Sequence, residues 1–374
     1  MTHAPIIRSL QAFCFRYPLA VPVVTSFGSM VNRPAVFVRV EDEDGQVGWG
    51  EAWSNFPSVG AEHRTRIVNE IIAPLVVGQR ISSAGVMFNE LSARFSTLAL
   101  QSGEQGPFAQ ALAAVDIALW DLLAKRAGVP LWRMLGGTSS QMRVYASGIN
   151  PEGCVATMER MQAQGHRAFK LKIGFDPAGD RANLRDLRHA AGGMMLAADV
   201  NQGWTLEQAM QLAPQLDAFD LAWLEEPLRA DRPWSEWHRL REVTAPPLAG
   251  GENIASVEAF DNALSEGALR VIQPDVAKWG GITACLAVAR TALAAGRLYC
   301  PHYLGGGIGL LASAHLLAAA GGDGLLEIDS NDNPLRDFFC GPVAQVRDGM
   351  IILSDEPGLG IEPDLAAIAQ YRTM

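Results

Sequence analysis

The C-terminal two thirds of this chain carry acidic, basic and metal-binding residue types at a nearly constant spacing. Successive members lie 23 to 27 residues apart, and they are Lys172, Asp199, Glu225, Glu252, Asp275, His302 and Glu327. Each stands at or just after the end of a short apolar run, such as AFKLK or MLAAD. One strand-plus-helix unit has about this length, so the repeat predicts a (β/α)8 barrel, whose catalytic groups collect where the strands end. We therefore expect these side chains to converge on one pocket of an enzyme.

The chain is longer than a barrel requires. It has 374 residues, whereas a barrel of this type typically takes ~250. The first 50 residues carry strand signals, including the alternating run AVFVRV, and helical periodicity follows from about Glu62. We predict an α/β fold, a (β/α)8-type (modified TIM) barrel with an N-terminal α+β domain completed by the C-terminus. The expected segments are the α+β domain (1–135), the barrel (136–340) and a returning segment (341–374).

The bulk composition excludes some partners. A net charge of −10 argues against nucleic acid and anionic membranes, which bind basic patches. The most apolar segment, residues 308–320, contains a histidine and is too short to span a bilayer. The five cysteines are odd in number and form no CxxC pair, as expected of reduced thiols in a cytoplasmic protein. No signal peptide is recognisable at the N-terminus.

Three carboxylates end consecutive predicted strands. They are Asp199, Glu225 and Glu252, which would project from neighbouring positions on the barrel rim. Hard oxygen ligands of this kind suit Mg²⁺, whereas zinc prefers histidine and cysteine. A single carboxylate would more often be a solvated loop residue, but three at matching strand ends favour a metal site.

Two further pairs have the residue types of acid–base chemistry. Lys170 and Lys172 are two apart on a strand, so both are expected to face the barrel mouth. Like charge, partial burial and a nearby metal would lower the pKa of each lysine toward neutrality. Asp275 and His302 end adjacent predicted strands, and a carboxylate on one imidazole nitrogen raises the basicity of the other.

Taken together, these motifs resemble those of the enolase superfamily, and most closely its mandelate racemase subgroup. The motifs are KLK (170–172), DVNQGW (199–204), LEEP (224–227), GGEN (250–253), PDVAKWGG (274–281), PH (301–302) and LE (326–327). The similarity extends over essentially the whole chain, because residues 112–137 resemble the junction between the capping domain and the barrel of that family.

The resemblance implies a role for each of these residues. It places Mg²⁺ on Asp199, Glu225 and Glu252, with Glu225 rather than Glu226 as the ligand. It makes Lys172 the base on one face of the substrate and His302, with Asp275, the acid or base on the other. It also implies that Lys170 contacts the substrate carboxylate and that Glu327 donates a hydrogen bond to that carboxylate. Asn201 would lie close to the metal, and Lys278 would lie behind the residues that touch the substrate. The shared chemistry is removal of the proton α to a carboxylate, which gives an enediolate.

Two outcomes can follow from that intermediate. We expect dehydration of a sugar acid to a 2-keto-3-deoxy acid, and the alternative is a mandelate racemase-like racemisation or epimerisation of a 2-hydroxy acid. Substrate choice is expected to lie in two capping-domain lids, residues 21–33 and 53–58, with Phe27, Arg33 and Trp53 as substrate contacts alongside Asn201. The run HYLGGGIG (302–309) differs from the mandelate racemase pattern, which argues against the substrate of that enzyme.

Two remoter readings come from other classes. Lys172 could form a Schiff base in a barrel aldolase, or the chain could be a non-catalytic binding relative. Metal dependence would oppose the first, and failure to bind Mg²⁺ would favour the second. The partner expected in either leading case is a small carboxylate, and a barrel with an apolar capping domain is expected to form a homo-oligomer. The sequence names neither the substrate nor the number of subunits.

Overall fold

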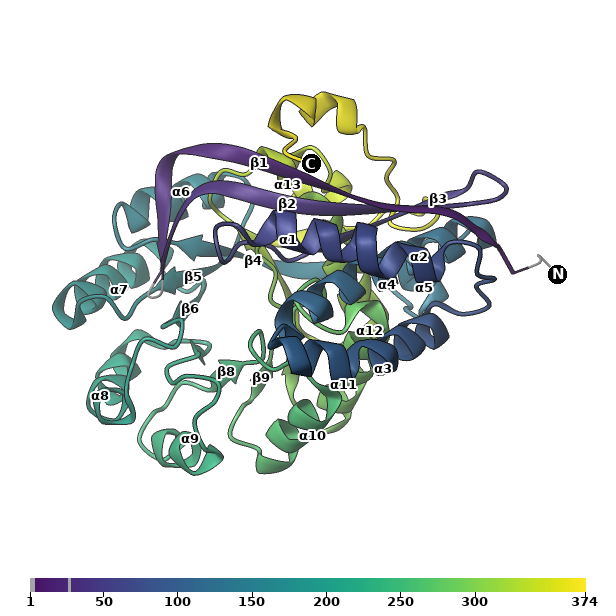
Figure 1. Cartoon of the computed structure of the whole chain (residues 1–374). Coiled ribbons are helices and arrows are strands. Elements are labelled where there is room, and N and C mark those ends of the chain that lie inside the picture. The colour runs from purple at the N-terminus through teal and green to yellow at the C-terminus, as the bar shows by residue number, and fades with distance from the viewer. Residues whose placement is uncertain (1–3, 26–27) are drawn as a thin grey trace.

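A computed structural model describes residues 4–25 and 28–374. Its N-terminal part is built on a three-stranded antiparallel sheet whose members are β1 (Ile7–Thr25), β2 (Gly28–Asp42) and β3 (Val47–Ala52). The two long strands β1 and β2 lie across the molecule above the barrel, and their hairpin end descends beside β5 (Figure 1). The capping sheet therefore reaches over the barrel from one side.

Helices cover one face of this sheet. They are α1 (Gly60–Arg66), the π-helix η1 (Ile67–Ile72), α2 (Ala73–Val76) and α4 (Gln105–Ala127). Outside this layer, α3 (Ala84–Ser102) packs on α4, and α5 (Leu131–Met134) packs on α4 and the barrel helix that spans residues 307–320. α4 packs directly against β3, where a Cβ on Gly50 would lie 2.0 Å from the carbonyl oxygen of Ala114. In the part of the chain that the structure describes, α4 alone is long and apolar enough to cross a membrane, by length and composition. Of its 18-residue apolar stretch, 78% is buried inside the protein.

Eight parallel strands form the second unit. In chain order they are β4 (Gln141–Ile149), β5 (Ala168–Lys172), β6 (Met195–Asp199), β7 (Leu224–Glu225), β8 (Leu248–Gly250), β9 (Val271–Ile272), β10 (Leu298–Tyr299) and β11 (Leu325–Asp329). Neighbours in the sheet follow the chain order, and β11 returns to pair with β4. This near-closed parallel sheet confirms the predicted (β/α)8-type barrel with its N-terminal α+β domain.

Helices separate the strands, as the repeat predicted. They are α6 (Cys154–Ala163), α7 (Pro177–Ala191), α8 (Leu206–Leu212) with η2 (Ala213–Phe219), α9 (Trp234–Arg241), α10 (Val257–Glu266), α11 (Gly281–Ala294) and α12 (Gly307–Ala320). Phe169 and Leu171 of β5 are fully buried in the core between strands and helices. The alternation along β5 therefore turns its two lysines to the barrel interior.

The strand register brings the spaced residues to one end of the barrel. Lys172 pairs with Asp199, and Asp199 pairs with Glu225. The next three members follow strands β8, β9 and β10 by two or three residues. Glu327 was predicted to end its strand, but β11 continues past it to Asp329. Its side chain is therefore within the strand rather than at the strand end.

The C-terminal segment contains α13 (Pro334–Asp337), η3 (Gly341–Ala344), β12 (Met350–Ile352) and η4 (Leu365–Tyr371). We expected its strand to return to the N-terminal domain, and this was wrong for β12, which pairs antiparallel with residues 141–143 of β4. That end of β4 precedes its ladder with β5, so it offers an unpaired edge. Beyond β12, the backbone N–H of Gly358 donates to the carbonyl of Val129, and the backbone N–H of Thr373 donates to the carbonyl of Cys14. The chain therefore ends against the capping domain (Figure 1).

Candidate active site

A cavity of about 280 Å³ opens where the capping hairpin meets the barrel. Its described walls comprise Val23, Met30, Arg33, Trp53, Asn55, Phe56, Gly148, Lys172, Asn201, Gln202, Glu252, Asn253, Lys278, His302, Leu304, Asp329 and Asn331. The predicted residues divide into two layers. Among the described residues, Lys172, Glu252 and His302 line the cavity, whereas the other members of the spaced set are buried and do not line it.

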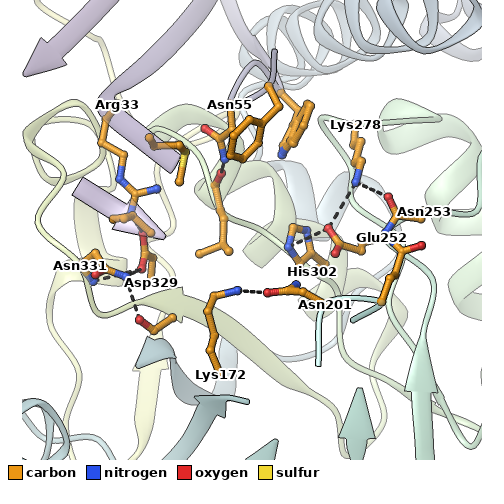
Figure 2. A pocket seen from close by; sticks show the side chains of 17 residues that line it. Arg33, Asn55, Lys172, Asn201, Glu252, Asn253, Lys278, His302, Asp329 and Asn331 are labelled. Carbon is orange, nitrogen blue, oxygen red and sulfur yellow. Dashed lines mark hydrogen bonds and ion pairs between the residues drawn. The ribbon is translucent and has the colours of Figure 1, made fainter. Parts of the chain in front are cut away.

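The two lysines of β5 have different surroundings. Lys170 Nζ lies 2.5 Å from Glu225 Oε1 and 2.8 Å from Glu327 Oε1. Lys172 reaches the cavity and donates to Asn201 Oδ1 (Figure 2). Burial alone would lower the pKa of Lys170, but the surrounding carboxylates raise it well above its usual value. The expected lowering of the pKa was therefore wrong for Lys170, because the carboxylates outweigh the effect of burial.

The proposed metal ligands are close in the fold but turned to different partners. Glu225 accepts from Lys170 and, through Oε2, from Gln273 Nε2 at 2.7 Å. Glu252 lies 3.3 Å from Lys278 Nζ and 3.1 Å from His302 Nε2. Within the described residues, no group of three or more His, Cys, Asp or Glu side chains is arranged to hold a metal ion. The three carboxylates share one barrel end, but their present conformations are directed at lysines and histidine.

The electrostatics of this end nevertheless suit a cation. Burial and the carboxylates of Asp199 and Glu327 raise the pKa of Glu225 to about 7, although Lys170 opposes this. Burial and the charge of Glu252 raise the pKa of Glu226 well above its usual value. Surplus negative charge of this kind is relieved by a bound cation. The ammonium of Lys170 lies among carboxylates where positive charge is favoured, so the residues fit a hard divalent cation in their chemistry.

His302 and Asp275 form the expected pair. Nδ1 of His302 lies 2.7 Å from Oδ2 of Asp275, and Oδ1 of Asp275 accepts from the backbone N–H groups of Ala277 and Lys278. Burial would lower the pKa of His302, but Glu252, Glu327 and Asp275 raise it to about 10. In this arrangement the imidazole is protonated at neutral pH and can donate from Nε2 toward the cavity.

Glu327 is an acceptor in this structure. Ser147 Oγ lies 2.5 Å from its Oε1, and the backbone N–H of Tyr303 donates to its Oε2 at 2.9 Å. Burial would raise its pKa, but Lys170 and His302 outweigh this and hold it below the usual value. The expected donor role requires a protonated carboxyl, and the surrounding cations oppose that state.

The two lids contribute unequally to the described site. Arg33 and Trp53 both line the cavity, as expected, whereas Phe27 lies outside the described residues. Trp53 is held by its backbone N–H to Ala277 at 3.0 Å, and Lys278 Nζ lies 4.9 Å from its ring centroid. Lys278 also donates to Asn253 at 2.7 Å, so it joins a capping-domain lid to the end of the barrel.

Sequence reasoning missed part of the site. Asp329 and Asn331 line the cavity, and Asp329 is paired with Arg33 across the two domains. A signal exists for Asp329, because it lies two residues after Glu327 and side chains at that spacing share one face of a strand; Asn331 follows just beyond the strand. Asn55 was also missed; its Nδ2 donates to the carbonyl of Leu304 at 2.6 Å.

A capped barrel with lysine, histidine and carboxylates around one cavity defines an enzyme for proton transfer on a small molecule. Residues 7–136 match the mandelate racemase / muconate lactonizing enzyme N-terminal domain, and residues 153–367 match the enolase C-terminal domain-like family. The chain belongs to the mandelate racemase/muconate lactonizing enzyme family of the enolase superfamily, which confirms the resemblance. It is an enzyme that abstracts the α-proton of a carboxylate substrate.

Curated relatives of this chain include lyases and isomerases. It is 31% identical to the 3,6-anhydro-alpha-L-galactonate cycloisomerase of Streptomyces coelicolor, over 98% of this chain and 99% of that protein. It is 32% identical to the D-galactonate dehydratase of Ralstonia pickettii, over 75% of this chain and 74% of that protein.

Solved structures extend the similarity to the whole fold. A mandelate racemase/muconate lactonizing enzyme from Bordetella bronchiseptica is 52% identical, with a TM-score of 0.93 over 98% of this chain and 99% of that one. A racemase from Streptomyces coelicolor solved with bound magnesium is 28% identical, with a TM-score of 0.87 over 98% of this chain and 100% of that one.

Proposed function

We propose that this enzyme removes the α-proton of a sugar acid and then expels the oxygen on the adjacent carbon, giving a 2-keto-3-deoxy acid. The observation that carries the proposal is that Lys172 and His302 line one cavity from strand ends that are not neighbours. β4 and β11 separate their strands on one side, and β6 to β9 separate them on the other. A substrate between them therefore meets Lys172 on one face and the protonated His302 on the other.

We propose Mg²⁺ as the resident cation, with Asp199, Glu225 and Glu252 as its ligands and Asn201 beside them. Carboxylate oxygens on three consecutive strands match its preference for hard donors. When bound, it would stabilise the negative charge that develops on the substrate carboxylate. Lys170, which pairs with Glu225 in this structure, would contact the substrate carboxylate.

The residues of the chain divide the proton transfers. Lys172 takes the α-proton, since it reaches the cavity next to Asn201. His302, held by Asp275, gives a proton to the leaving oxygen from the other side of the cavity. Proton transfer by a positioned side chain contributes about 10²–10⁴-fold to a rate. Glu327 fixes Lys170 and the loop at Tyr303 rather than donating to the substrate.

The relatives favour a second form of the same elimination. In a 3,6-anhydro sugar acid the oxygen on C3 belongs to a ring, so its expulsion opens the ring instead of releasing water. The first step and the residues are unchanged. A cycloisomerase is therefore the second candidate, favoured by a match with such an enzyme over 98% of this chain. Racemisation requires only that His302 return the proton to the carbon.

The decisive experiment screens sugar acids and anhydro sugar acids with MgCl₂ in D₂O. We expect 2-keto acid formation in the wild type and in neither Lys172→Ala nor His302→Ala, and we expect exchange of the α-proton with solvent deuterium, measured by NMR, to be lost in Lys172→Ala. Activity that survives chelation of the metal, together with borohydride trapping of Lys172, would instead support an aldolase. Exchange that persists in the double variant would refute the proposed bases.

The remaining proposals concern the domain limits, the cellular location and the partners of the protein. We propose domain limits of 1–135, 136–340 and 341–374; the first limit agrees with the N-terminal family match, which ends at residue 136. The five cysteines are all buried and unpaired, which supports a reducing, cytoplasmic location. We also propose a small carboxylate as the partner, with assembly into a homo-oligomer.

A further inference from the structure

We infer that the distal end of the cavity binds the neutral, hydroxylated end of a monoacid sugar and rejects a second carboxylate. This rests on the proposed function and narrows its substrate class. The structural basis is the buried contact between Arg33 of the capping strand β2 and Asp329 of the barrel strand β11.

The pair lies across the cavity from His302 and Glu252 (Figure 2). Figure 2 shows Arg33, Asp329 and Asn331 on one side of the cavity, with Glu252, His302 and Lys278 on the other. A substrate whose carboxylate and α-carbon face the second side therefore presents its far end to the first. Arg33 and Asp329 are the charged groups that this far end meets among the described wall residues.

The charge of Arg33 is already balanced. Its guanidinium is bound to Asp329 Oδ2, and the side chains are only 3% and 4% exposed. A free arginine would attract a distal carboxylate by a charged, two-point contact. Here an incoming carboxylate would approach Asp329 as well, and like charges in a buried site repel strongly.

The unused hydrogen-bonding atoms of the pair match a hydroxyl group. Arg33 Nε is buried and finds no partner among the described residues. Oδ2 of Asp329 keeps a free lone pair, because it accepts from Arg33 alone, whereas Oδ1 already accepts two hydrogen bonds from Asn331. A hydroxyl can donate to this free lone pair of Asp329 Oδ2, whereas a carboxylate only accepts.

The position of Asp329 is fixed by its surroundings. The backbone N–H and the side-chain Nδ2 of Asn331 donate to its Oδ1 at 3.0 and 2.8 Å. Gly148, with φ +67°, leaves space for this carboxylate, because a Cβ there would lie only 2.5 Å from Oδ1. The anionic side of the pair therefore cannot easily turn away from an incoming ligand.

The test compares monoacid and diacid sugars of the same configuration that differ only at C6. Binding is measured by calorimetry with MgCl₂, beside the turnover of each acid. We expect the wild type to favour the monoacid by at least about tenfold, as expected for like charges in a buried site. Equal or tighter binding of the diacid by the wild type would overturn the inference.

Two variants should move the preference in opposite directions. Asp329→Asn leaves Arg33 with its full charge, so diacid binding should strengthen at least about tenfold relative to the monoacid. Arg33→Gln leaves Asp329 unbalanced, so the preference for the monoacid should increase. If the pair only holds the two domains together, each variant would weaken the binding of the monoacid and the diacid equally. That result would overturn the inference.

Glu62→Gln is the matched control, since it breaks a comparable arginine–carboxylate pair with Arg16 away from the cavity. It should leave the preference unchanged. If Asp329→Asn does not fold, Arg33→Gln decides alone, and an unchanged or reduced preference for the monoacid then refutes the inference. Failure of the proposed function is separate, because it appears as absent turnover for every acid while the binding preference remains measurable.

Discussion

His302 and Asp275 are joined by a 2.7 Å contact between Nδ1 and Oδ2, across the ends of the neighbouring strands β10 and β9. The contact holds the ring so that Nε2 faces Glu252 and the cavity. Because the carboxylate is fully buried at the base of the ring, its role is to orient the histidine and stabilise its charged form. The pair therefore acts as one unit on one side of the substrate.

Asp275→Asn should lower kcat on the order of 10²-fold, the lower range for general acid–base catalysis, with little change in KM. The amide can still hydrogen-bond but no longer balances the charge of His302. Steady-state kinetics on a turned-over acid measures the effect, and Asp275→Glu should restore part of it. Asp217→Asn, which removes a surface carboxylate bonded to Ala245, is the control. A rise in KM alone would contradict an orienting role.

Glu252→Gln should weaken Mg²⁺ binding by at least about tenfold, because even groups that only support a ligand cost about 10- to 100-fold in metal affinity. Titration calorimetry with MgCl₂ gives the affinity directly, without substrate. The exposed Glu258 on the following helix α10 provides the control variant Glu258→Gln. Unchanged affinity in Glu252→Gln would remove this residue from the ligand set.

Glu51 links the capping domain to the loop that carries His302. Its two oxygens accept from the backbone N–H groups of Gly306 and Gly309, at 2.5 and 2.8 Å, where α12 begins. Glu51→Ala would leave these buried donors without a partner, at a cost of about 1–3 kcal/mol. Chemical denaturation should show this loss, and kcat should fall because the loop after His302 loses its anchor.

Glu51→Gln is the companion variant, since its amide oxygen can still accept one of the two hydrogen bonds. It should fall between the wild type and Glu51→Ala in both stability and kcat. A folded Glu51→Ala variant with wild-type kcat would show that this contact supports the fold alone.

The Arg16–Glu62 pair should make stability depend on pH in the acid range. The hydrogen bond from Arg16 lowers the pKa of Glu62 from 4.5 to about 2. A carboxyl with a lowered folded-state pKa contributes stability that is complete above its unfolded value and is lost as pH falls toward the folded value. The free-energy difference between wild type and Glu62→Gln should therefore be constant above about pH 5 and shrink below it. Denaturation curves between pH 3 and 7, a range chosen around these values, test this, and a difference that grows on acidification would contradict it.

Local patterns in the sequence determined the scaffold and most of the reacting set. The repeat of apolar run and polar terminus predicts a barrel because each unit is formed by residues near one another in the chain. Period-two alternation then placed Lys170 and Lys172 on one face, and the structure has Phe169 and Leu171 in the core as expected. The order of motifs was enough to identify the family.

The electrostatics were decided by the tertiary structure. The lysine pair suggested a lowered pKa, but the barrel places Glu225 and Glu327 against Lys170 and raises it. The partner of β12 was also decided there, because only the assembled sheet shows which edge of β4 is left open.

The contact between Arg33 and Asp329, where the far end of the substrate is expected to bind, was likewise decided by the tertiary structure. Arg33 was recognised as a lid residue, but its partner is 296 positions away in the chain. No local pattern encodes such a contact, since it exists only when the capping strand lies over the barrel mouth. The sequence by itself therefore determined which chemistry this enzyme can perform. The tertiary structure decided which charges are already balanced when the substrate arrives, because burial and pairing depend on residues distant in the chain.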